Sequence, residues 1–274
     1  MKLILLALLL VFPLQLHAQE QTEEPTESGK LRDFGKEVER TANEPKRKEH
    51  PKSEEELARE HESDAATVEL LVDILHTIFE SAIREPKDTI AVPDEYHTFS
   101  QYPYAEEGHG LYKIGGAKDL SLNLKANYYR EAPDLMGGGA RLRLSPYRAF
   151  SAEAYVTLLS EQLKSRTDRI MLTSFFVNYH LVRENAWTMW IGFGSKGVIG
   201  AGANEASLSG NATIEVYPVD PISFHANFSW GAYSELFATL NYHLNRYTFS
   251  VGYQSLVAGK ADLHGFLLGS SLYF

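Results

Sequence analysis

The sequence predicts an all-β fold: a closed antiparallel transmembrane β-barrel of about ten strands, preceded by a disordered tether and one amphipathic helix. Two observations carry this prediction. From about Lys118 onward, apolar and polar residues alternate with a period of two, as side chains do on the two faces of a strand. The apolar positions hold large and aromatic residues, whereas the positions between them hold Ser, Thr, Asn, Gly and few charges. A soluble two-sheet sandwich is the alternative, because soluble antiparallel sheets alternate too.

Residues 1–18 have the three parts of a secretory signal peptide. Lys2 supplies a positive charge, Leu3–Leu16 is an almost unbroken apolar run, and Ala18 is a small residue at the expected cleavage site. The run is shorter than the roughly 18–20 apolar residues that a membrane-spanning helix needs. We therefore expect this segment to be cleaved and the remaining chain to be exported.

The composition argues against several classes of protein. The chain has no cysteine, which excludes disulfides, thiolate metal sites, cysteine nucleophiles and the cysteine-linked lipid anchor of exported lipoproteins. Its formal net charge of -10 argues against a nucleic-acid partner, since binding phosphates needs a basic surface. The histidines show no metal-ligand spacing, so neither a metal nor another cofactor is predicted.

Residues 19–64 are predicted to be a solvated tether. Roughly half of them are charged, both signs are mixed, and Pro25, Pro45 and Pro51 interrupt any periodic pattern. So little apolar surface cannot offset the entropy lost when the chain becomes ordered. A tail that binds the cell wall or a partner is the alternative interpretation.

Residues 65–85 are predicted to form an amphipathic helix. Apolar residues such as Val68, Leu71, Leu75 and Phe79 recur at steps of three and four, with acidic residues on the opposite face. We expect the apolar stripe to pack against the rest of the chain, with self-association or docking on a partner as alternatives. Residues 86–117 remain unassigned and fit a loop, a plug segment or an extra strand.

Ten alternating segments fill residues 118–274, the predicted barrel domain. In the clearest, Ile222–Trp230, every second residue is apolar and every residue between is polar. Most have the roughly nine to eleven residues that a tilted strand needs to cross hydrocarbon. The strand number must be even if both ends of the barrel lie on one side, so ten is expected and eight or twelve also fit. The segments lie near residues 119–130, 138–145, 149–160, 168–181, 186–196, 210–218, 221–230, 235–244, 247–256 and 262–274.

Aromatic residues on these segments form two groups, as the two lipid–water interfaces of a membrane barrel require. This favours the barrel over the sandwich. One predicted belt consists of Phe150, Tyr179, Trp187, Tyr242, Tyr247 and Phe274. The other consists of Tyr128, Phe193, Trp230, Tyr233 and Tyr253.

The last strand carries apolar residues at alternate positions before a final aromatic residue: Phe266, Leu268, Leu272 and Phe274, with Ser270 a weak position among them. This ending resembles the terminal strand of bacterial outer-membrane β-barrel proteins. The resemblance covers the last strand closely and names a class without a particular family within it. It implies an outer-membrane location, outer-membrane lipid and the barrel-assembly machinery as partners, and an N-terminal region in the periplasm. The predicted helix 65–85 would then meet any partner in the periplasm.

The turns suggest how the strands pair. Short turns such as Pro218–Pro221 and Asn245–Arg246 are expected on the periplasmic side, with longer outer connections, as around Gly197–Ser209. One assumed register sets Arg141 opposite Glu153, and another sets Glu215 opposite His225, where opposite charges attract.

With the large apolar residues facing lipid, ten ionisable residues face inward. A barrel this narrow is usually filled by its own side chains, so a self-satisfied polar network is expected. The predicted network consists of Lys125, Arg141, Arg143, Glu153, His180, Lys196, Glu215, His225, Glu235 and His243.

We therefore expect a non-catalytic role: structural, adhesive or partner-binding. A small channel for ions or solutes is the first alternative, and a lipid-modifying outer-membrane enzyme is the second. His225 with Glu215 and Ser223 would offer a base, its orienter and a nucleophile. However, no local signature holds a serine beside a histidine, and the predicted outer loops are too short to build a substrate cleft.

Overall fold

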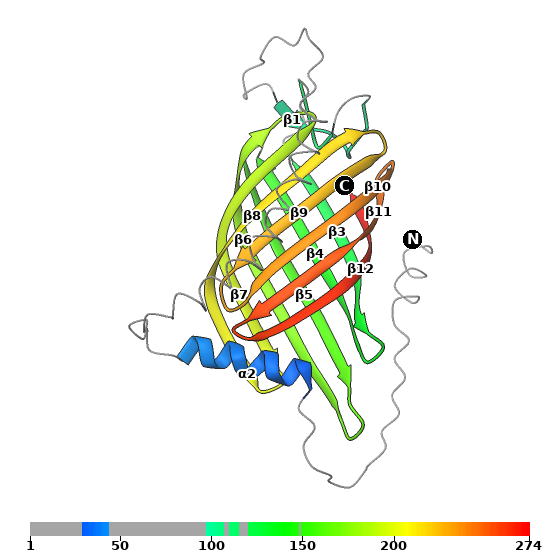
Figure 1. Cartoon of the computed structure of the whole chain (residues 1–274). Helices are drawn as coiled ribbons and strands as arrows, with labels where there is room; N and C mark the ends of the chain where they lie inside the picture. Colours follow the sequence, from blue (N-terminus) through cyan, green and yellow to red (C-terminus); the bar gives the residue numbers. More distant parts are fainter. Residues whose placement is uncertain (1–28, 44–96, 107–109, 115–119, 148) are drawn as a thin grey trace, which may run out of the picture.

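Ten strands of the chain close into one antiparallel barrel (Figure 1). The computed structural model describes residues 29–43, 97–106, 110–114, 120–147 and 149–274. The predicted signal peptide 1–18 and the predicted helix 65–85 lie outside these residues. The predicted fold class, a closed antiparallel barrel of ten strands, is confirmed.

Each barrel strand pairs with its neighbours in sequence, and the last strand pairs with the first to complete the circle. The strands are β3 (Ser121–Ala132), β4 (Leu135–Tyr147), β5 (Phe150–Gln162), β6 (Thr167–Arg183), β7 (Trp187–Gly200), β8 (Ala203–Val219), β9 (Ile222–Trp230), β10 (Ser234–Leu244), β11 (Tyr247–Ala258) and β12 (Ala261–Tyr273).

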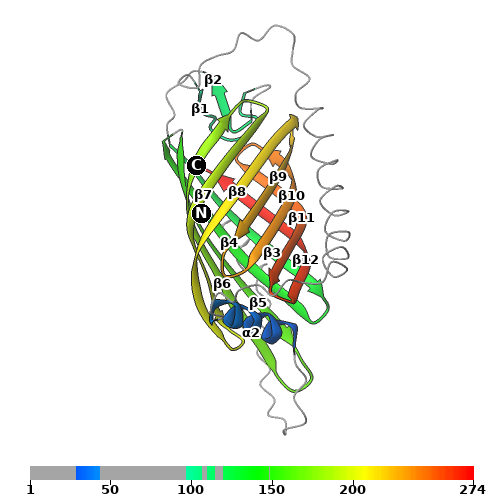
Figure 2. The same cartoon turned by 60° about the vertical axis from the view of Figure 1, so that its left-hand side comes forward.

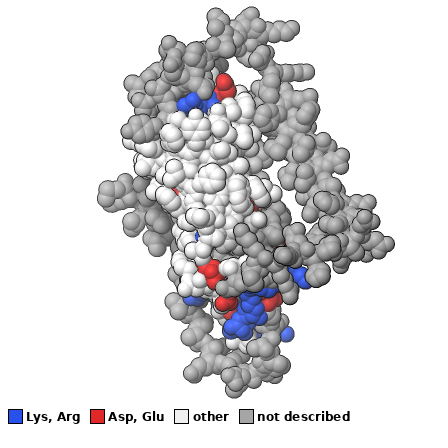
Figure 3. All heavy atoms as spheres, turned by 90° about the vertical axis from the view of Figure 1, so that its left-hand side faces the viewer, with Lys and Arg blue, Asp and Glu red and all other residues white. Residues whose placement is uncertain are grey.

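The outer face of the barrel is apolar. Buried and exposed residues alternate along the strands, so the sequence period of two becomes an inner and an outer face. Large apolar residues are highly exposed, with Leu208 at 91%, Phe193 at 73% and Phe266 at 72%. On the face seen in Figure 3, charged side chains gather near the two ends of the barrel and are almost absent from the wall between them. An apolar surface of this extent requires a covering, and lipid suits it.

In the pairing of β8 with β9, Glu215 lies opposite His225, as expected. The register at the turn differs from the prediction: Ile222 pairs with Val219 where Pro218 was expected, and an irregularity between Val216 and Val219 restores the predicted pair.

In the β4–β5 hairpin the prediction was wrong: Glu153 lies opposite Arg143, and Arg141 lies opposite Tyr155. Tyr147 pairs with Phe150 beside the turn, and an irregularity lies between Leu144 and Tyr147. Leu144 therefore lies opposite Ala152, two residues away from the partner that a longer turn would give.

The long connection expected around Gly197–Ser209 is absent, because β7 and β8 form a tight hairpin there. Strand β7 continues to Gly200, and β8 starts at Ala203. Gly200 and Gly202 have φ angles of 102° and 89°, a conformation that glycine adopts without a steric cost. These glycines allow the tight turn, so the strands extend where a loop was predicted.

Helix α2 (Lys30–Asn43) lies across one end of the barrel (Figure 1). Leu31, Phe34 and Val38 recur at steps of three and four and are fully or almost fully buried against that end. The prediction that residues 19–64 form a disordered tether is therefore wrong for residues 30–43. This charged segment has too few apolar residues to fold by itself, and it becomes helical because its apolar side packs against apolar residues of the barrel.

A short antiparallel pair, β1 (His97–Phe99) and β2 (Tyr112–Ile114), lies at the other end (Figure 2). Phe99, Leu111 and Tyr112 pack there with Tyr217 and Tyr273 of the barrel. Of the possibilities left open for residues 86–117, the described part thus resembles a plug. Within the described residues, no helix is long and apolar enough to cross a membrane.

Candidate functional site

The interior of the barrel has an apolar half and a polar half. The apolar half adjoins α2 and includes Leu159, Ile170, Val198, Leu256 and Leu263, all buried. The polar half lies towards the end where β12 finishes. This division arises from the residue types at inward strand positions, and the apolar stripe of α2 fills the apolar end.

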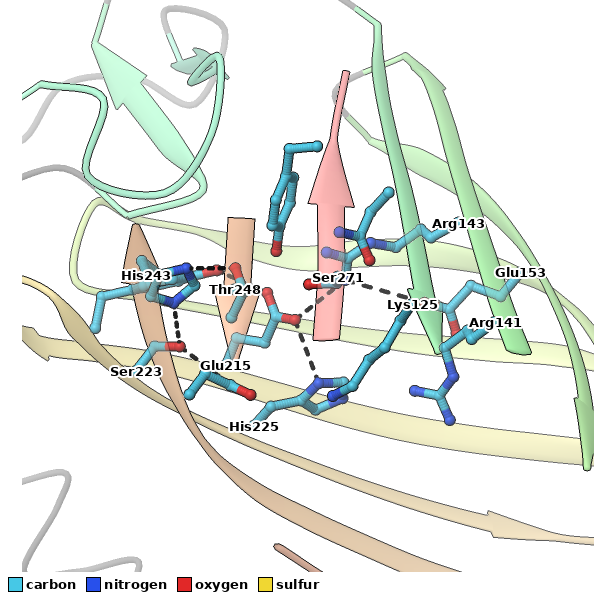
Figure 4. A pocket seen from close by; sticks show the side chains of 14 residues that line it. Lys125, Arg141, Arg143, Glu153, Glu215, Ser223, His225, His243, Thr248 and Ser271 are labelled. Carbon is cyan, nitrogen blue, oxygen red and sulfur yellow. Dashed lines mark hydrogen bonds and ion pairs between the residues drawn. The ribbon is translucent and has the colours of Figure 1, made fainter. Parts of the chain in front are cut away.

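All ten residues of the predicted lumen network are buried. Seven of them line one cavity of about 20 Å³, which is room for about one water molecule. Figure 4 shows how these side chains meet from several strands. The seven are Lys125, Arg141, Arg143, Glu153, Glu215, His225 and His243. His180, Lys196 and Glu235 lie elsewhere in the interior.

Glu215 is the centre of the largest charge cluster. Its Oε1 atom lies 3.2 Å from Arg143 Nη1 and 3.5 Å from His225 Nδ1. The Tyr217 hydroxyl donates to its Oε2 atom at 2.7 Å. Arg143 also lies 4.0 Å from Glu153, so this one guanidinium serves both carboxylates. Such engagement is what a carboxylate needs inside a barrel, where unpaired charge is costly.

Lys125 and Arg141 are arranged differently. They lie directly opposite each other on β3 and β4, and both are at least nine-tenths buried. Neither has a carboxylate or hydrogen-bond partner among the described residues. Lys125 Nζ lies 4.9 Å from the ring centre of Phe237, and the Arg141 guanidinium lies 4.9 Å from the same ring. Arg141 also lies 4.8 Å from the ring centre of Tyr155, so both cations lie against aromatic faces.

A third cluster holds Lys196 nearer the apolar half. Its amino group donates to Ser229 at 2.8 Å and lies 3.3 Å from Glu235. The Gln254 amide donates to the same carboxylate at 2.7 Å. Lys196 also lies 3.6 Å from the ring centre of Tyr233. This lysine is therefore paired, in contrast to Lys125.

Two buried histidines have a serine within hydrogen-bond distance, which sequence reasoning missed. Ser223 Oγ lies 2.7 Å from His243 Nε2, and Ser151 Oγ lies 2.9 Å from His180 Nε2. No local sequence signature announces these pairs, because they form across neighbouring strands. The available signal was the diagonal position of the two residues on paired strands. Ser223 lies opposite Asn241, and His243 follows Asn241 by two residues on the same face of β10.

These serine–histidine pairs lack the third group of a catalytic triad. The other ring nitrogen of His243 meets Thr248 Oγ1 at 2.9 Å, and that of His180 meets the Tyr112 hydroxyl at 2.8 Å. In both pairs a hydroxyl stands where a triad places a carboxylate. The predicted combination of His225, Glu215 and Ser223 does not form either, because Ser223 contacts His243 instead.

Most residues predicted for the aromatic belts lie on the outer face. Phe150, Tyr179, Tyr242, Tyr247, Phe274, Phe193, Trp230 and Tyr253 are exposed, while Trp187 and Tyr128 are partly exposed. The prediction that Tyr233 belongs to an outer aromatic belt was wrong. Tyr233 is 2% exposed, and the centre of its ring lies 5.8 Å from that of Phe34 in α2. It lies between β9 and β10, where the strand alternation that assigned its face no longer applies.

The terminal residues predicted as an assembly signal also lie outside. Phe266, Leu268 and Phe274 are exposed, and Leu272 is partly exposed. No group of three or more His, Asp or Glu side chains in the described ranges is arranged to hold a metal ion.

Comparisons with known proteins bear on the barrel. No protein-family model matches the sequence, and no curated protein matches it. Similar solved structures include the N-terminal β-barrel domain of Pseudomonas aeruginosa OprF, with 13% identity and a TM-score of 0.30 over 57% of this chain and 98% of that one. The outer-membrane protein OprG of the same organism has 9% identity and a TM-score of 0.33, covering 58% and 98%. Ail, the attachment invasion locus protein of Yersinia pestis, has 9% identity and a TM-score of 0.28, covering 57% and 96%. These neighbours are bacterial outer-membrane barrels, and the likeness extends to the architecture alone.

Proposed function

We propose that this chain is an integral outer-membrane β-barrel with a closed lumen and a non-catalytic role: structural, adhesive or partner-binding. One observation carries the proposal. Helix α2 occupies one end of the barrel, the β1–β2 pair occupies the other, and the polar cavity between them has room for about one water molecule. A barrel filled in this way offers little path for a solute.

The closure by α2 is built from apolar packing and polar anchors. Besides the buried stripe, the Glu161 carboxylate accepts the backbone N–H groups of Lys30 at 3.0 Å and of Leu31 at 2.9 Å. Lys30 forms an ion pair with Glu131, which raises the pKa of this lysine. Glu37, on the next turns of the helix, accepts the backbone N–H of Lys260 at 3.4 Å. The helix is thus attached at its start and near its middle.

The closure at the other end uses aromatic residues. Tyr104 lies edge-on to Tyr217 and His243, with ring centres 5.8 Å and 5.5 Å away, and its hydroxyl donates to the Ile222 carbonyl. Tyr112 reaches His180 in the same region. These contacts hold the plug against barrel strands far away in the sequence.

The closed interior also weighs against an enzyme. Both serine–histidine pairs are buried behind the plug and lack a carboxylate at the second ring nitrogen. A nucleophile needs an oriented base and access to its substrate. Unchanged masses of lipid A and phospholipids after overexpression are the expected result, and a new lipid product would contradict it.

The position of α2 alters the expected topology. If Phe274 faces the periplasm, as the terminal strand implies, α2 lies at the outer mouth of the barrel (Figure 1). Residues 30–43 would then reach the cell surface, and the expectation of a wholly periplasmic N-terminal region would not hold for them. An exposed helix face at the mouth suits the partner-binding role.

Conductance separates the closed barrel from the channel alternative. We expect purified full-length protein in planar bilayers to give no single-channel steps. Regular steps whose ion selectivity changes in Glu215→Gln would overturn the closed lumen and support a small channel. Heat-dependent migration on a semi-native gel should first show that each preparation contains the folded barrel.

A further inference from the structure

We propose that the polar half of the barrel binds a small monovalent anion, such as chloride, between Lys125 and Arg141. The two side chains enter the lumen from neighbouring strands β3 and β4 and line the same cavity (Figure 4). Their exposed fractions are 6% and 7%. Like charges placed directly opposite on two strands repel each other, so a negative charge nearby would stabilise the pair.

The carboxylates of the cavity are already engaged. Arg143 contacts both Glu153 and Glu215, and His225 and Tyr217 also contact Glu215. Glu235, the next inward carboxylate, is held by Lys196 and Gln254. Among the described residues, no carboxylate lies within ion-pair distance of Lys125 or Arg141.

Counting the charges around the cavity gives the valence of the ligand. Lys125, Arg141 and Arg143 are three basic side chains of the cavity, whereas Glu153 and Glu215 are its two carboxylates. Basic groups exceed carboxylates by one, so one monovalent anion would balance the cluster with all three basic groups protonated. A buried charge without a counter-charge is costly, so this balance favours an ion over water alone.

The cavity also limits the size of the ligand. Its volume of about 20 Å³ suits an ion close to a water molecule in size. A halide meets this limit, whereas phosphate and carboxylate ligands require more room. Phe237 faces both cations and belongs to the apolar cluster, so the two cations lie where the polar half meets the apolar half.

Bromide, which stands in for chloride, allows a direct test on the wild-type protein. Crystals of the full chain in sodium bromide should show an anomalous peak between Lys125 Nζ and the Arg141 guanidinium. The peak should vanish in a crystal grown in sodium gluconate. Absence of the peak at saturating bromide, or a peak elsewhere only, would overturn the proposal.

A solution measurement adds a matched control. The unfolding midpoint of detergent-solubilised barrel should rise with bromide at constant ionic strength, relative to gluconate, and then saturate. Lys125→Met and Arg141→Gln should weaken the apparent affinity by roughly tenfold or more, since each removes a charge-assisted contact. Arg130→Gln, on the exposed face of β3, should leave it unchanged. An equal response in all four proteins would contradict an internal site.

Discussion

The Glu161 carboxylate accepts the backbone N–H of Leu31 at 2.9 Å and so joins the start of helix α2 to a strand 130 residues further along the chain. It accepts the N–H of Lys30 as well, and thereby caps a helix whose first donors have no intrahelical partner. Position and charge both matter here, because a carboxylate at a helix N-terminus also meets the positive end of the helix dipole.

Glu161→Ala should loosen this end of α2. Loss of the cap is expected to destabilise the docked helix by about 1–2 kcal/mol. The rate of tryptic cleavage at Arg32 should rise while the barrel stays assembled on a semi-native gel. Glu205→Gln on strand β8 removes a charge outside the cap and should leave the rate unchanged; equal acceleration in both variants would show that the cap is not the cause.

Phe34→Ala should release more of the helix than the loss of the cap does. Phe34 is fully buried and meets Tyr233 edge-on, so its truncation is expected to cost about 3–5 kcal/mol of docking free energy. Hydrogen exchange of the α2 amides should accelerate, with barrel amides unaffected. Lys36→Ala, on the exposed side of the helix, is the control. Unchanged protection in Phe34→Ala would argue against apolar docking.

The absence of cysteine makes the topology directly testable, because any introduced cysteine is the only one. In intact cells, Lys36→Cys on α2 should react with a membrane-impermeant maleimide. Arg246→Cys, in the turn at the opposite end, should react only after the outer membrane is permeabilised. The reverse pattern would place α2 in the periplasm and remove the surface-exposed helix from the proposed function.

Glu215→Leu should destabilise the barrel strongly, since it leaves Arg143 with a more distant carboxylate in a buried site. Breaking a buried pair from one side typically costs about 3–5 kcal/mol. The double variant Arg143→Met with Glu215→Leu should recover part of this loss, measured as the urea midpoint of the detergent-solubilised protein. Additive losses in the double variant would mean that the pair contributes nothing as a unit.

The barrel was predictable because period-two alternation is a local property of the chain. The ten predicted segments correspond to the ten strands. The registers were less predictable, because both the β4–β5 and the β8–β9 hairpins contain an irregularity near the turn that alternation does not reveal. In β8–β9 the pair of Glu215 with His225 forms nonetheless, whereas in β4–β5 Arg141 lies opposite Tyr155 instead of Glu153.

Helix α2 was missed for a different reason. Leu31, Phe34 and Val38 are three apolar residues in a segment dominated by charge, and their burial depends on an apolar surface formed by distant strands. Tyr233 was misassigned because its position between strands has no alternation to fix its face. The serine–histidine pairs likewise depend on register, which links residues such as Ser151 and His180 across two strands.

Helix α2 contacts strands β5, β6, β7 and β8 as well as β11 and β12. Its binding surface therefore exists only when early and late parts of the barrel have come together in space. Complete docking of this helix therefore requires a closed wall, and the docked helix connects strands from separate parts of the ring. A variant whose strands assemble but whose helix does not dock should therefore have a barrel that deforms more easily at that end.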